Sequence, residues 1–536
     1  MPAWHLRFHI DVADKPESFD VAIIGGGLAG LTLALQLRQT APSISILVLE
    51  KNSLPPPPAA HKVGEATVEI GAHYLAHTLG LKDRLEATQL RKFGLRLFFG
   101  SGHCQDLADA DELGASSLLP AISYQLDRGI LEKDLYDILI ERGVEVRDRS
   151  RATNVAINTP PDRHQITVSG DDAEYAVLCR WLIDASSRSA VLKRQLGMTA
   201  ASKHQMSAAW FRLDASISVD NWSDDKTWQA RCNGLSRLPS TNHLMGSGYW
   251  AWIIPLVGGR SSIGLVSDPA IVPLSSYDSF EKFRAWLDNH QPLLAEQVND
   301  QASALMDFRK LGKLAHGSQR VWSRDCWAMT GEAGVFADPF YSPGTDFIAL
   351  SNTFITDLVT RRCSDAERGI RSSVYEKLYQ SFFQSTMTLY QDQYGGFGDT
   401  RLMSIKLTWD YAYYWSILAW LYFREVLTEL TFLRSAQQDI LAIRALNDTM
   451  QARFRECAAR RRVDRGAGRF IDQISIPLML ELNAALLEPA ASPEKELGEN
   501  CERLQRLAPM LLAMIDGRKA PLGANTLLGD LEARLA

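Results

Sequence analysis

The chain has 536 residues, which exceeds one ordinary hydrophobic core, so we expect two lobes or a large domain with an appendage. A net charge of −6 gives no footprint for nucleic acid, and no stretch is apolar enough to predict a membrane span. The 7 cysteines are scattered without a C-x-x-C spacing. This pattern indicates reduced thiols of a cytoplasmic protein and neither a disulfide frame nor a zinc site.

The first elements predict a dinucleotide cradle. An apolar run at 19–24 has the length of a strand, residues 28–39 have helical apolar spacing, and residues 44–49 form a second strand. Gly25-Gly26-Gly27-Leu28-Ala29-Gly30 lies between the first strand and the helix. This is the strand-turn-helix-strand order that the G-x-G-x-x-G fingerprint requires.

Each glycine of the fingerprint has a physical role. Gly25 permits the tight turn, Gly27 lets the backbone approach a pyrophosphate beside Ala29, and Gly30 allows close packing of helix on strand. Glu50 follows Gly30 by 20 residues, where a carboxylate accepts hydrogen bonds from the adenosine ribose. The turn alone does not distinguish FAD from NAD.

Two later segments favour FAD. Residues 175–189 read as a strand that ends at Asp184 and resemble the second shared motif of glutathione-reductase-type FAD proteins. Residues 327–334 resemble their third motif, where an acid meets the ribityl chain; Glu332 replaces the usual Asp there. Gly258-Gly259 is typical of a hairpin turn, so we find no second fingerprint. We therefore expect bound FAD, reduced by a separate NAD(P)H-dependent flavin reductase.

Three segments resemble the flavin-dependent halogenases, and the likeness extends from about residue 19 to about residue 349. Residues 61–67 are similar to the K-x-G-E-S/A-T/S segment beside the flavin, which implies a cofactor contact for Lys62. Residues 250–255 carry the W-x-W-x-I-P motif, and residues 337–345 are similar to the D-P-x-x-S-x-G turn. In the family, halide meets flavin at this turn.

The resemblance implies a chemistry. Reduced FAD and O₂ give a flavin C4a-hydroperoxide, halide attacks its distal oxygen, and the hypohalous acid travels to a lysine beside an electron-rich arene. Lys92 lies in a segment similar to the one that holds this lysine, and burial would make its nitrogen nucleophilic. The alternative for Lys92 is a surface position between a helix and a strand. Lys62 competes, but by resemblance it lies beside the flavin.

One departure from the family pattern and one pair of aromatic residues concern halide and substrate. Pro343 stands where relatives often present an N–H to chloride, so chloride or bromide would rely on the amides of Gly344 and Thr345. Trp250 and Trp252 point to the same face of one strand. They are either core residues or they exclude substrate from the flavin.

The nature of the substrate follows from one further position. Tyr341 replaces the glutamate of tryptophan halogenases, which is more similar to members that act on phenols, pyrroles or other activated arenes. We expect an aromatic small molecule, either free or tethered to a carrier protein. Residues 124–139 resemble the strand and helix whose arginine lies near FAD, which makes Arg128 a candidate cofactor contact; a salt-bridged helix start is the equal alternative.

The predicted architecture is an α/β fold: a glutathione-reductase-type, Rossmann-like FAD-binding domain with an inserted mixed β-sheet and a C-terminal α-helical lobe. We place the FAD-binding halogenase core at 1–350, with the sheet insertion at about 200–320, and the helical substrate-side lobe at 351–536. Helices are expected at 350–361, 373–389, 408–433 and 436–462. Most aromatics of 409–422 are expected to pack, and one or two to line a pocket. The basic cluster 460–462 predicts a solvated helix face.

The leading hypothesis is therefore FADH₂- and O₂-dependent halogenation of an electron-rich aromatic or conjugated small molecule. One alternative is a flavin monooxygenase or oxidoreductase that uses the same scaffold without halide. Another is a flavin-binding protein without turnover.

Overall fold

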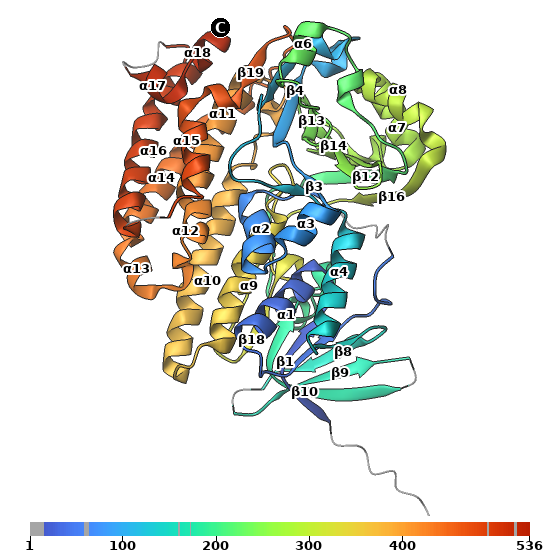
Figure 1. Cartoon of the computed structure of the whole chain (residues 1–536), viewed down its shortest axis with the longest axis vertical. Coiled ribbons are helices and arrows are strands. Elements are labelled where there is room, and N and C mark those ends of the chain that lie inside the picture. The colour runs from blue at the N-terminus through green and yellow to red at the C-terminus, as the bar shows by residue number, and fades with distance from the viewer. Residues whose placement is uncertain are drawn as a thin grey trace, which may run out of the picture.

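The computed structural model describes residues 16–57, 64–158, 161–171, 173–489, 492–518 and 523–535. Two large sheets and a mass of C-terminal helices make up this part of the chain (Figure 1). Among the described residues, no helix has the length and apolarity to cross a membrane.

The first sheet carries the predicted cradle. Its order is β7-β2-β1-β10-β9-β8, and β18 pairs with β10. The strands are β1 (Glu17–Ile24), β2 (Ile46–Leu49), β7 (Glu145–Arg147), β8 (Arg151–Ala156), β9 (His164–Ser169), β10 (Glu174–Asp184) and β18 (Trp327–Met329). The five strands β7, β2, β1, β10 and β18 are parallel to one another. Parallel neighbours need a crossover connection, and α1 (Leu28–Thr40) provides it between β1 and β2. The predicted strand-turn-helix-strand unit is confirmed.

The second sheet has eight strands in the order β16-β12-β15-β14-β13-β4-β5-β19. They are β4 (Leu95–Phe99), β5 (Asp111–Gly114), β12 (Ser207–Leu213), β13 (Thr241–Gly246), β14 (Tyr249–Leu256), β15 (Arg260–Ser267), β16 (Leu305–Leu311) and β19 (Phe470–Asp472). The β13–β4 and β5–β19 pairs are parallel and the others antiparallel, so the sheet is mixed, as expected. Its predicted limits of about 200–320 are too narrow, because β4, β5 and β19 come from outside them.

Both faces of this second sheet are buried, which explains the nearly continuous apolar sequence of β14. Tyr249, Ala251 and Ile253 face a core that α7 (Phe280–His290) and α8 (Pro292–Asp300) cover. Trp250 and Trp252 face the main core in the middle of the molecule. Side chains alternate along a strand, so the two tryptophans share one face, as the sequence predicts.

The shorter helices between the strands lie mainly around the first sheet and the start of the second. They are α2 (Glu69–His73), α3 (Lys82–Thr88), α4 (Arg128–Glu141), α5 (Val191–Gln195) and α6 (Lys226–Ala230). Of these, α2 matters most for the site, because it packs against α9 and α12 of the helical region.

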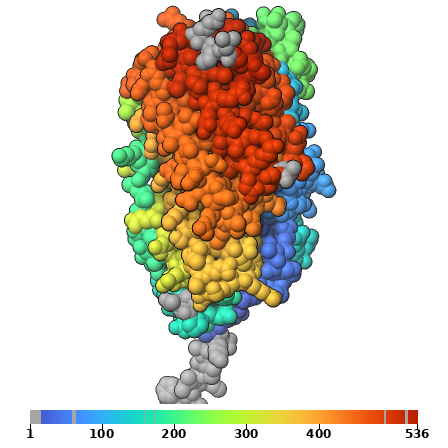
Figure 2. Space-filling view, turned by 90° about the vertical axis from the view of Figure 1, so that its left-hand side faces the viewer, coloured from blue at the N-terminus to red at the C-terminus, as the bar shows by residue number. Residues whose placement is uncertain are grey.

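The C-terminal helices form most of one side of the molecule (Figure 2). They are α9 (Gly344–Thr360), α10 (Asp365–Thr388), α11 (Thr400–Tyr413), the π-helix η10 (Tyr414–Ala419), α12 (Trp420–Phe423), α13 (Leu430–Ser435), α14 (Gln437–Ala458), α15 (Pro477–Ala485), α16 (Pro493–Ile515), α17 (Ala524–Leu528) and α18 (Leu531–Arg534). The main hydrophobic core runs without interruption from the first sheet into these helices.

Three sequence predictions about this region need correction. The boundary at 350/351 falls inside α9, whose residues pack on α1 and α2 of the core. The helix expected at 408–433 changes to a π-helix at Tyr414 and is interrupted at Glu425, whose φ is +56°. The helix expected at 436–462 is α14, which ends at Ala458. The basic cluster 460–462 therefore lies after this helix and not on its face.

Candidate functional site

The glycine-rich turn has the geometry of a phosphate cradle. Gly25 has a φ of +117°, and a Cβ there would lie 2.3 Å from the carbonyl oxygen of Ala185. A Cβ on Gly30 would lie 2.0 Å from the carbonyl oxygen of Gly25. A Cβ on Gly27 would meet no atom within 4 Å. Packing thus requires two of the glycines, while Gly27 leaves space at the N-terminus of α1, which suits a pyrophosphate.

Glu50 and Ala29 lie at the edges of this turn. The Glu50 carboxylate accepts hydrogen bonds from the Gly26 N–H at 2.8 Å and from the Asn52 N–H at 2.9 Å. It is therefore fixed at the end of β2, and its bond to a ribose stays a prediction. A Cβ on Gly331 would lie 3.0 Å from the Ala29 methyl group, so the third predicted motif packs against the first turn of α1.

The second and third motifs also meet each other, because β10 and β18 are adjacent parallel strands. Asp184 is fully buried, and its carboxylate accepts hydrogen bonds from the Ser186 hydroxyl at 2.6 Å and the Leu192 N–H at 2.7 Å. It stabilises its own turn. Glu332 is half-buried and accepts a hydrogen bond from the Ser187 hydroxyl at 2.7 Å. Contacts of either acid with a cofactor stay predictions.

Arg128 begins α4 and pairs with Glu132 at 2.6 Å, so the salt-bridged helix start is present. A Cβ on Gly64 would lie 3.0 Å from its guanidinium, which places Arg128 beside the segment of the K-x-G-E motif. A contact between Arg128 and the cofactor stays a prediction. Lys62 lies outside the described residues.

Lys92 is buried, so the alternative of a surface lysine is wrong. It follows the short strand β3 (Leu90–Arg91) and precedes β4, and its main-chain N–H donates to the Ser123 carbonyl at 2.8 Å. Its side chain turns inward, is 6% exposed, and donates from Nζ to the carbonyl oxygen of Thr67 at 3.0 Å. Among the described residues, none forms an ion pair with this ammonium.

Buried acids surround Lys92 at longer range. Burial lowers the pKa of Lys92 to about 8, and the charges of Glu69 and Asp346 oppose that shift. Burial also raises the pKa of Glu69 and raises that of Asp346 to about 8. Burial, with the charge of Lys92, lowers the pKa of His243 well below its usual range. These groups form a buried cluster of ionisable side chains whose pKa values burial shifts away from their ordinary values.

Asp346 joins three elements that are distant in sequence. Its Oδ1 accepts a hydrogen bond from the Gly71 N–H in α2 at 2.8 Å. Its Oδ2 accepts one from the Tyr414 hydroxyl at the start of the π-helix, at 2.7 Å. The sequence analysis did not single out Asp346 or Glu69. An acid in the first turn of a helix is common, and only the position of Asp346 directly after the D-P-x-x-S-x-G turn could have indicated it.

The two tryptophans pack beside that turn. Their ring centroids are 5.7 Å apart, and the Phe340 ring lies 5.3 Å from Trp250 in an edge contact. The Trp252 indole donates to the Ser262 hydroxyl at 3.2 Å. Packing in the core is thus observed, and exclusion of substrate from the flavin stays a prediction.

A buried hydrogen-bond network stabilises the turn at residues 337–345. Asp338 accepts from the Tyr394 hydroxyl at 2.6 Å, from His204 Nε2 at 2.7 Å, and from the Phe340 N–H at 2.9 Å. Tyr394 accepts in turn from the Trp250 indole at 2.9 Å. Sequence reasoning missed His204 and Tyr394, because both are far from the turn in the sequence and carry no motif.

The predicted halide position coincides with the N-terminus of a long helix. Pro343 is the residue before α9, and Gly344 and Thr345 begin that helix. The first amides of a helix have no intrahelical acceptor and lie at the positive end of its dipole. A Cβ on Gly344 would meet no atom within 4 Å, so there is open space here. Halide binding at these amides stays a prediction.

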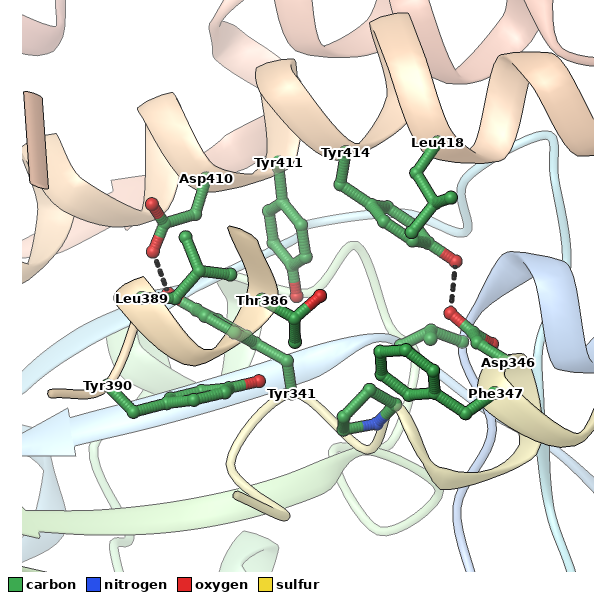
Figure 3. A pocket seen from close by; sticks show the side chains of 12 residues that line it. Tyr341, Asp346, Phe347, Thr386, Leu389, Tyr390, Asp410, Tyr411, Tyr414 and Leu418 are labelled. Atoms are coloured by element: carbon green, nitrogen blue, oxygen red, sulfur yellow. Dashed lines mark hydrogen bonds between the residues drawn. The ribbon is translucent and has the colours of Figure 1, made fainter. Parts of the chain in front are cut away.

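An aromatic cavity adjoins this turn and the π-helix (Figure 3). Its walls are mostly apolar or aromatic, with two carboxylates. They consist of Val68, Tyr341, Pro343, Asp346, Phe347, Thr386, Leu389, Tyr390, Asp410, Tyr411, Tyr414 and Leu418. Tyr411 and Tyr414 come from the predicted aromatic stretch, which confirms that one or two of its members line a pocket.

Comparisons with known proteins agree with this arrangement. Residues 18–247 match the family model of an FAD binding domain. The flavin-dependent halogenase chlA of Dictyostelium discoideum is 29% identical over 433 residues, which cover 75% of this chain and 70% of that protein. A 1H-pyrrole-2-carbonyl-(peptidyl-carrier protein) chlorinase of Pseudomonas fluorescens is 23% identical over 375 residues, which cover 63% and 75%.

The fold is shared with a solved halogenase over almost the whole chain. The structure of halogenase PltM in complex with phloroglucinol and FAD has a TM-score of 0.61 at 16% identity, and the match covers 96% of each chain. The cradle lies within the residues that the FAD binding domain model matches. The chain therefore carries an FAD binding domain and is similar to flavin-dependent halogenases in sequence and in fold.

Proposed function

We propose that this protein uses reduced FAD, O₂ and chloride or bromide to halogenate an electron-rich aromatic small molecule. The observation that carries the proposal is the buried ammonium of Lys92, which points into the protein toward the acids beside the aromatic cavity. A lysine in such surroundings has no structural ion pair to form and is poised to bind or react with an oxidant.

Each motif then has a role. FAD, held at Gly25, Gly27 and Gly30, would when bound and reduced activate O₂ for the oxidation of halide to hypohalous acid. The helix N-terminus at Gly344 and Thr345 binds the halide, because its free amides and dipole attract an anion. Lys92 holds the hypohalous acid or takes up its halogen, and presents it to the substrate.

The cavity supports an aromatic substrate. Tyrosine rings and aliphatic side chains offer stacking and apolar contact, and the hydroxyl and carboxylate groups can fix a polar substituent. PltM is known with phloroglucinol bound, which makes a phenol the first substrate to test. The pyrrole chlorinase acts on a carrier-bound pyrrole, so a carrier-tethered substrate is the second. A separate NAD(P)H-dependent flavin reductase would supply FADH₂.

The test is halide-dependent product formation. Purified protein is incubated with FAD, a flavin reductase, NADH, air and either chloride or bromide, with phloroglucinol or pyrrole-2-carboxamide as acceptor. We expect mass shifts that match the halide supplied, and their loss in Lys92→Ala. Lys193→Ala is the matched control: Lys193 is also buried with its pKa lowered to about 8, but its ammonium donates to Gly334, on the cofactor side. Normal turnover in Lys92→Ala would overturn the role of Lys92.

One alternative function has specific support. Pro343 removes an N–H from the predicted halide position, and Glu332 departs from the usual FAD motif. Both favour a monooxygenase or oxidoreductase on the same scaffold. Isotope from labelled O₂ in the product, formed equally well without halide, would select this alternative.

A further inference from the structure

The aromatic cavity contains two carboxylate–tyrosine pairs (Figure 3). Tyr341 donates to Asp410 at 2.7 Å, and Tyr414 donates to Asp346 at 2.7 Å. The pairs come from different elements, since Tyr341 belongs to the turn before α9 and Tyr414 to the π-helix. Only one of the two acids is compensated by a neighbouring cation.

Asp410 is the compensated acid. It pairs with Lys406 at 2.8 Å, one turn earlier in α11, and it accepts a further hydrogen bond from Gln451 at 2.7 Å. Both oxygens are occupied and the negative charge is balanced.

Asp346 is in the opposite state. Among the described residues no lysine or arginine lies within ion-pair distance of it, and its partners are one amide and one hydroxyl. Burial raises its pKa to about 8, and the charge of Glu69 raises it further while that of Lys92 lowers it. The ionisable groups that face it are Glu69, Lys92, Tyr390, Tyr414 and Tyr422.

We propose that Asp346 is the base that accepts the proton of a phenolic hydroxyl bound in the cavity, with Tyr414 holding the carboxylate in position. The inference rests on the proposed function and names the acidic hydroxyl that its substrate carries. Glu69 does not line the cavity, and Asp410 is balanced by Lys406, which leaves Asp346 as the wall acid with a proton-accepting oxygen.

The step balances as follows. The phenol O–H bond breaks, its proton moves to the Asp346 carboxylate, and the electron pair enters the ring. The activated ring carbon attacks the halogen of a hypohalous acid held by Lys92; a carbon–halogen bond forms and the halogen–oxygen bond breaks. The released hydroxide takes the proton from Asp346 and leaves as water. Loss of the ring proton from the halogenated carbon, and its return to the oxygen, restores the phenol.

The experiment compares kcat/KM across pH with phloroglucinol, in the complete system with FAD and reductase. We expect Asp346→Asn to lower kcat/KM by roughly 10²–10⁴-fold near pH 8, where the wild-type carboxyl group, with its pKa raised to about 8, is ionised in a large share of the molecules and can act as a general base. The deficit should shrink as pH rises, because phloroglucinol then arrives already ionised. Tyr414→Phe should lower kcat/KM by about 10-fold and should shift the pH profile to higher pH, because the lost hydrogen bond from Tyr414 holds the pKa of Asp346 down.

Asp357→Asn is the matched control. Asp357 lies on the same helix and also accepts from a tyrosine hydroxyl, that of Tyr375, at 2.7 Å, but it pairs with Arg361 and lies away from the cavity. Its kcat/KM should equal that of the wild type. If Asp346→Asn shows no loss of kcat/KM, or a loss that is constant across pH, the role of Asp346 is overturned while the proposed function stands. A wild-type enzyme without halogenation at any pH overturns the proposed function itself.

Discussion

The ammonium nitrogen of Lys92 lies 3.0 Å from the main-chain carbonyl oxygen of Thr67, to which it donates a hydrogen bond. This contact joins the two sequence segments that were identified separately, the K-x-G-E region and the lysine segment. A carbonyl oxygen orients the ammonium without neutralising its charge. A carboxylate at the same place would neutralise that charge. Lys92 therefore keeps the lowered pKa that burial imposes.

Burial of this lysine should cost stability, and the cost should depend on pH. The pKa of Lys92 is about 8 in the folded chain, against an ordinary value of 10.5. That difference corresponds to a net penalty on the order of 3 kcal/mol at pH 7, which already includes the opposing charges of Glu69 and Asp346. We expect Lys92→Met to abolish halogenation and to raise the free energy of unfolding at pH 7 by about 1–3 kcal/mol.

The stability gained by Lys92→Met should depend on pH. Between pH 8 and 10.5 the unfolded wild type holds more protons on this lysine than the folded one, so its stability rises with pH there. The advantage of the methionine variant should accordingly shrink across that window. Denaturant titrations of both proteins at pH 7 and at pH 10 measure it. A variant that is less stable than the wild type at both pH values contradicts the assigned burial cost.

Two neighbouring tyrosines allow a matched test of the network under the halide turn. The Tyr394 hydroxyl bonds both Asp338 and Trp250, whereas the buried Tyr390 hydroxyl has no hydrogen-bond partner among the described residues. We expect Tyr394→Phe to lower the free energy of unfolding by about 2–4 kcal/mol, because two buried groups lose their partner. Tyr390→Phe should change it by less than about 0.5 kcal/mol. Equal losses in the two variants, measured by denaturant titration, would show that the network is not stabilising.

The sequence allowed prediction of features that depend on local order. Gly25 and Gly30 sit where short-range geometry forbids a side chain, and Trp250 and Trp252 share a face because strands alternate. Lys92 could be proposed from its segment. Its burial could not, since that depends on residues distant in the sequence, such as Asp346 of α9, whose charge acts on its ammonium.

The buried acids and the hydrogen-bond network of the site could not be predicted from the sequence, for the same reason. Asp346 acquires its character from Gly71 and Tyr414, which precede and follow it by 275 and 68 residues. Long-range pairings of this kind leave no periodic signal. The π-helix at Tyr414 is likewise a local departure from an ordinary helical pattern, and it changes which aromatic side chains face the cavity.

Replacement of the proline before α9 should strengthen halide binding. Pro343 has helical backbone angles that alanine adopts readily, and alanine adds an N–H beside the open space at Gly344. One added hydrogen bond of about 1 kcal/mol predicts a roughly 3–10-fold lower halide KM in Pro343→Ala. Pro339→Ala, in the same turn, is the control and should leave that KM unchanged. If both variants keep the wild-type halide KM, the halide does not contact this position.

The cradle offers a final pair of substitutions that separates folding from cofactor binding. Gly25→Ala would place a methyl group 2.3 Å from the Ala185 carbonyl at a φ of +117°, so we expect it to lower the free energy of unfolding by more than about 2 kcal/mol even without FAD. Gly27 has an extended backbone, and a new methyl group there would have free space around it. The Gly27→Ala apoprotein should therefore unfold at the wild-type midpoint. That methyl group nevertheless occupies the space through which a pyrophosphate approaches the backbone, and FAD affinity should fall at least about 10-fold. Thermal unfolding of the apoproteins and fluorescence titration with FAD measure the two effects independently. Unchanged FAD affinity in Gly27→Ala would place the pyrophosphate elsewhere, because a ligand against this turn must contact that methyl group.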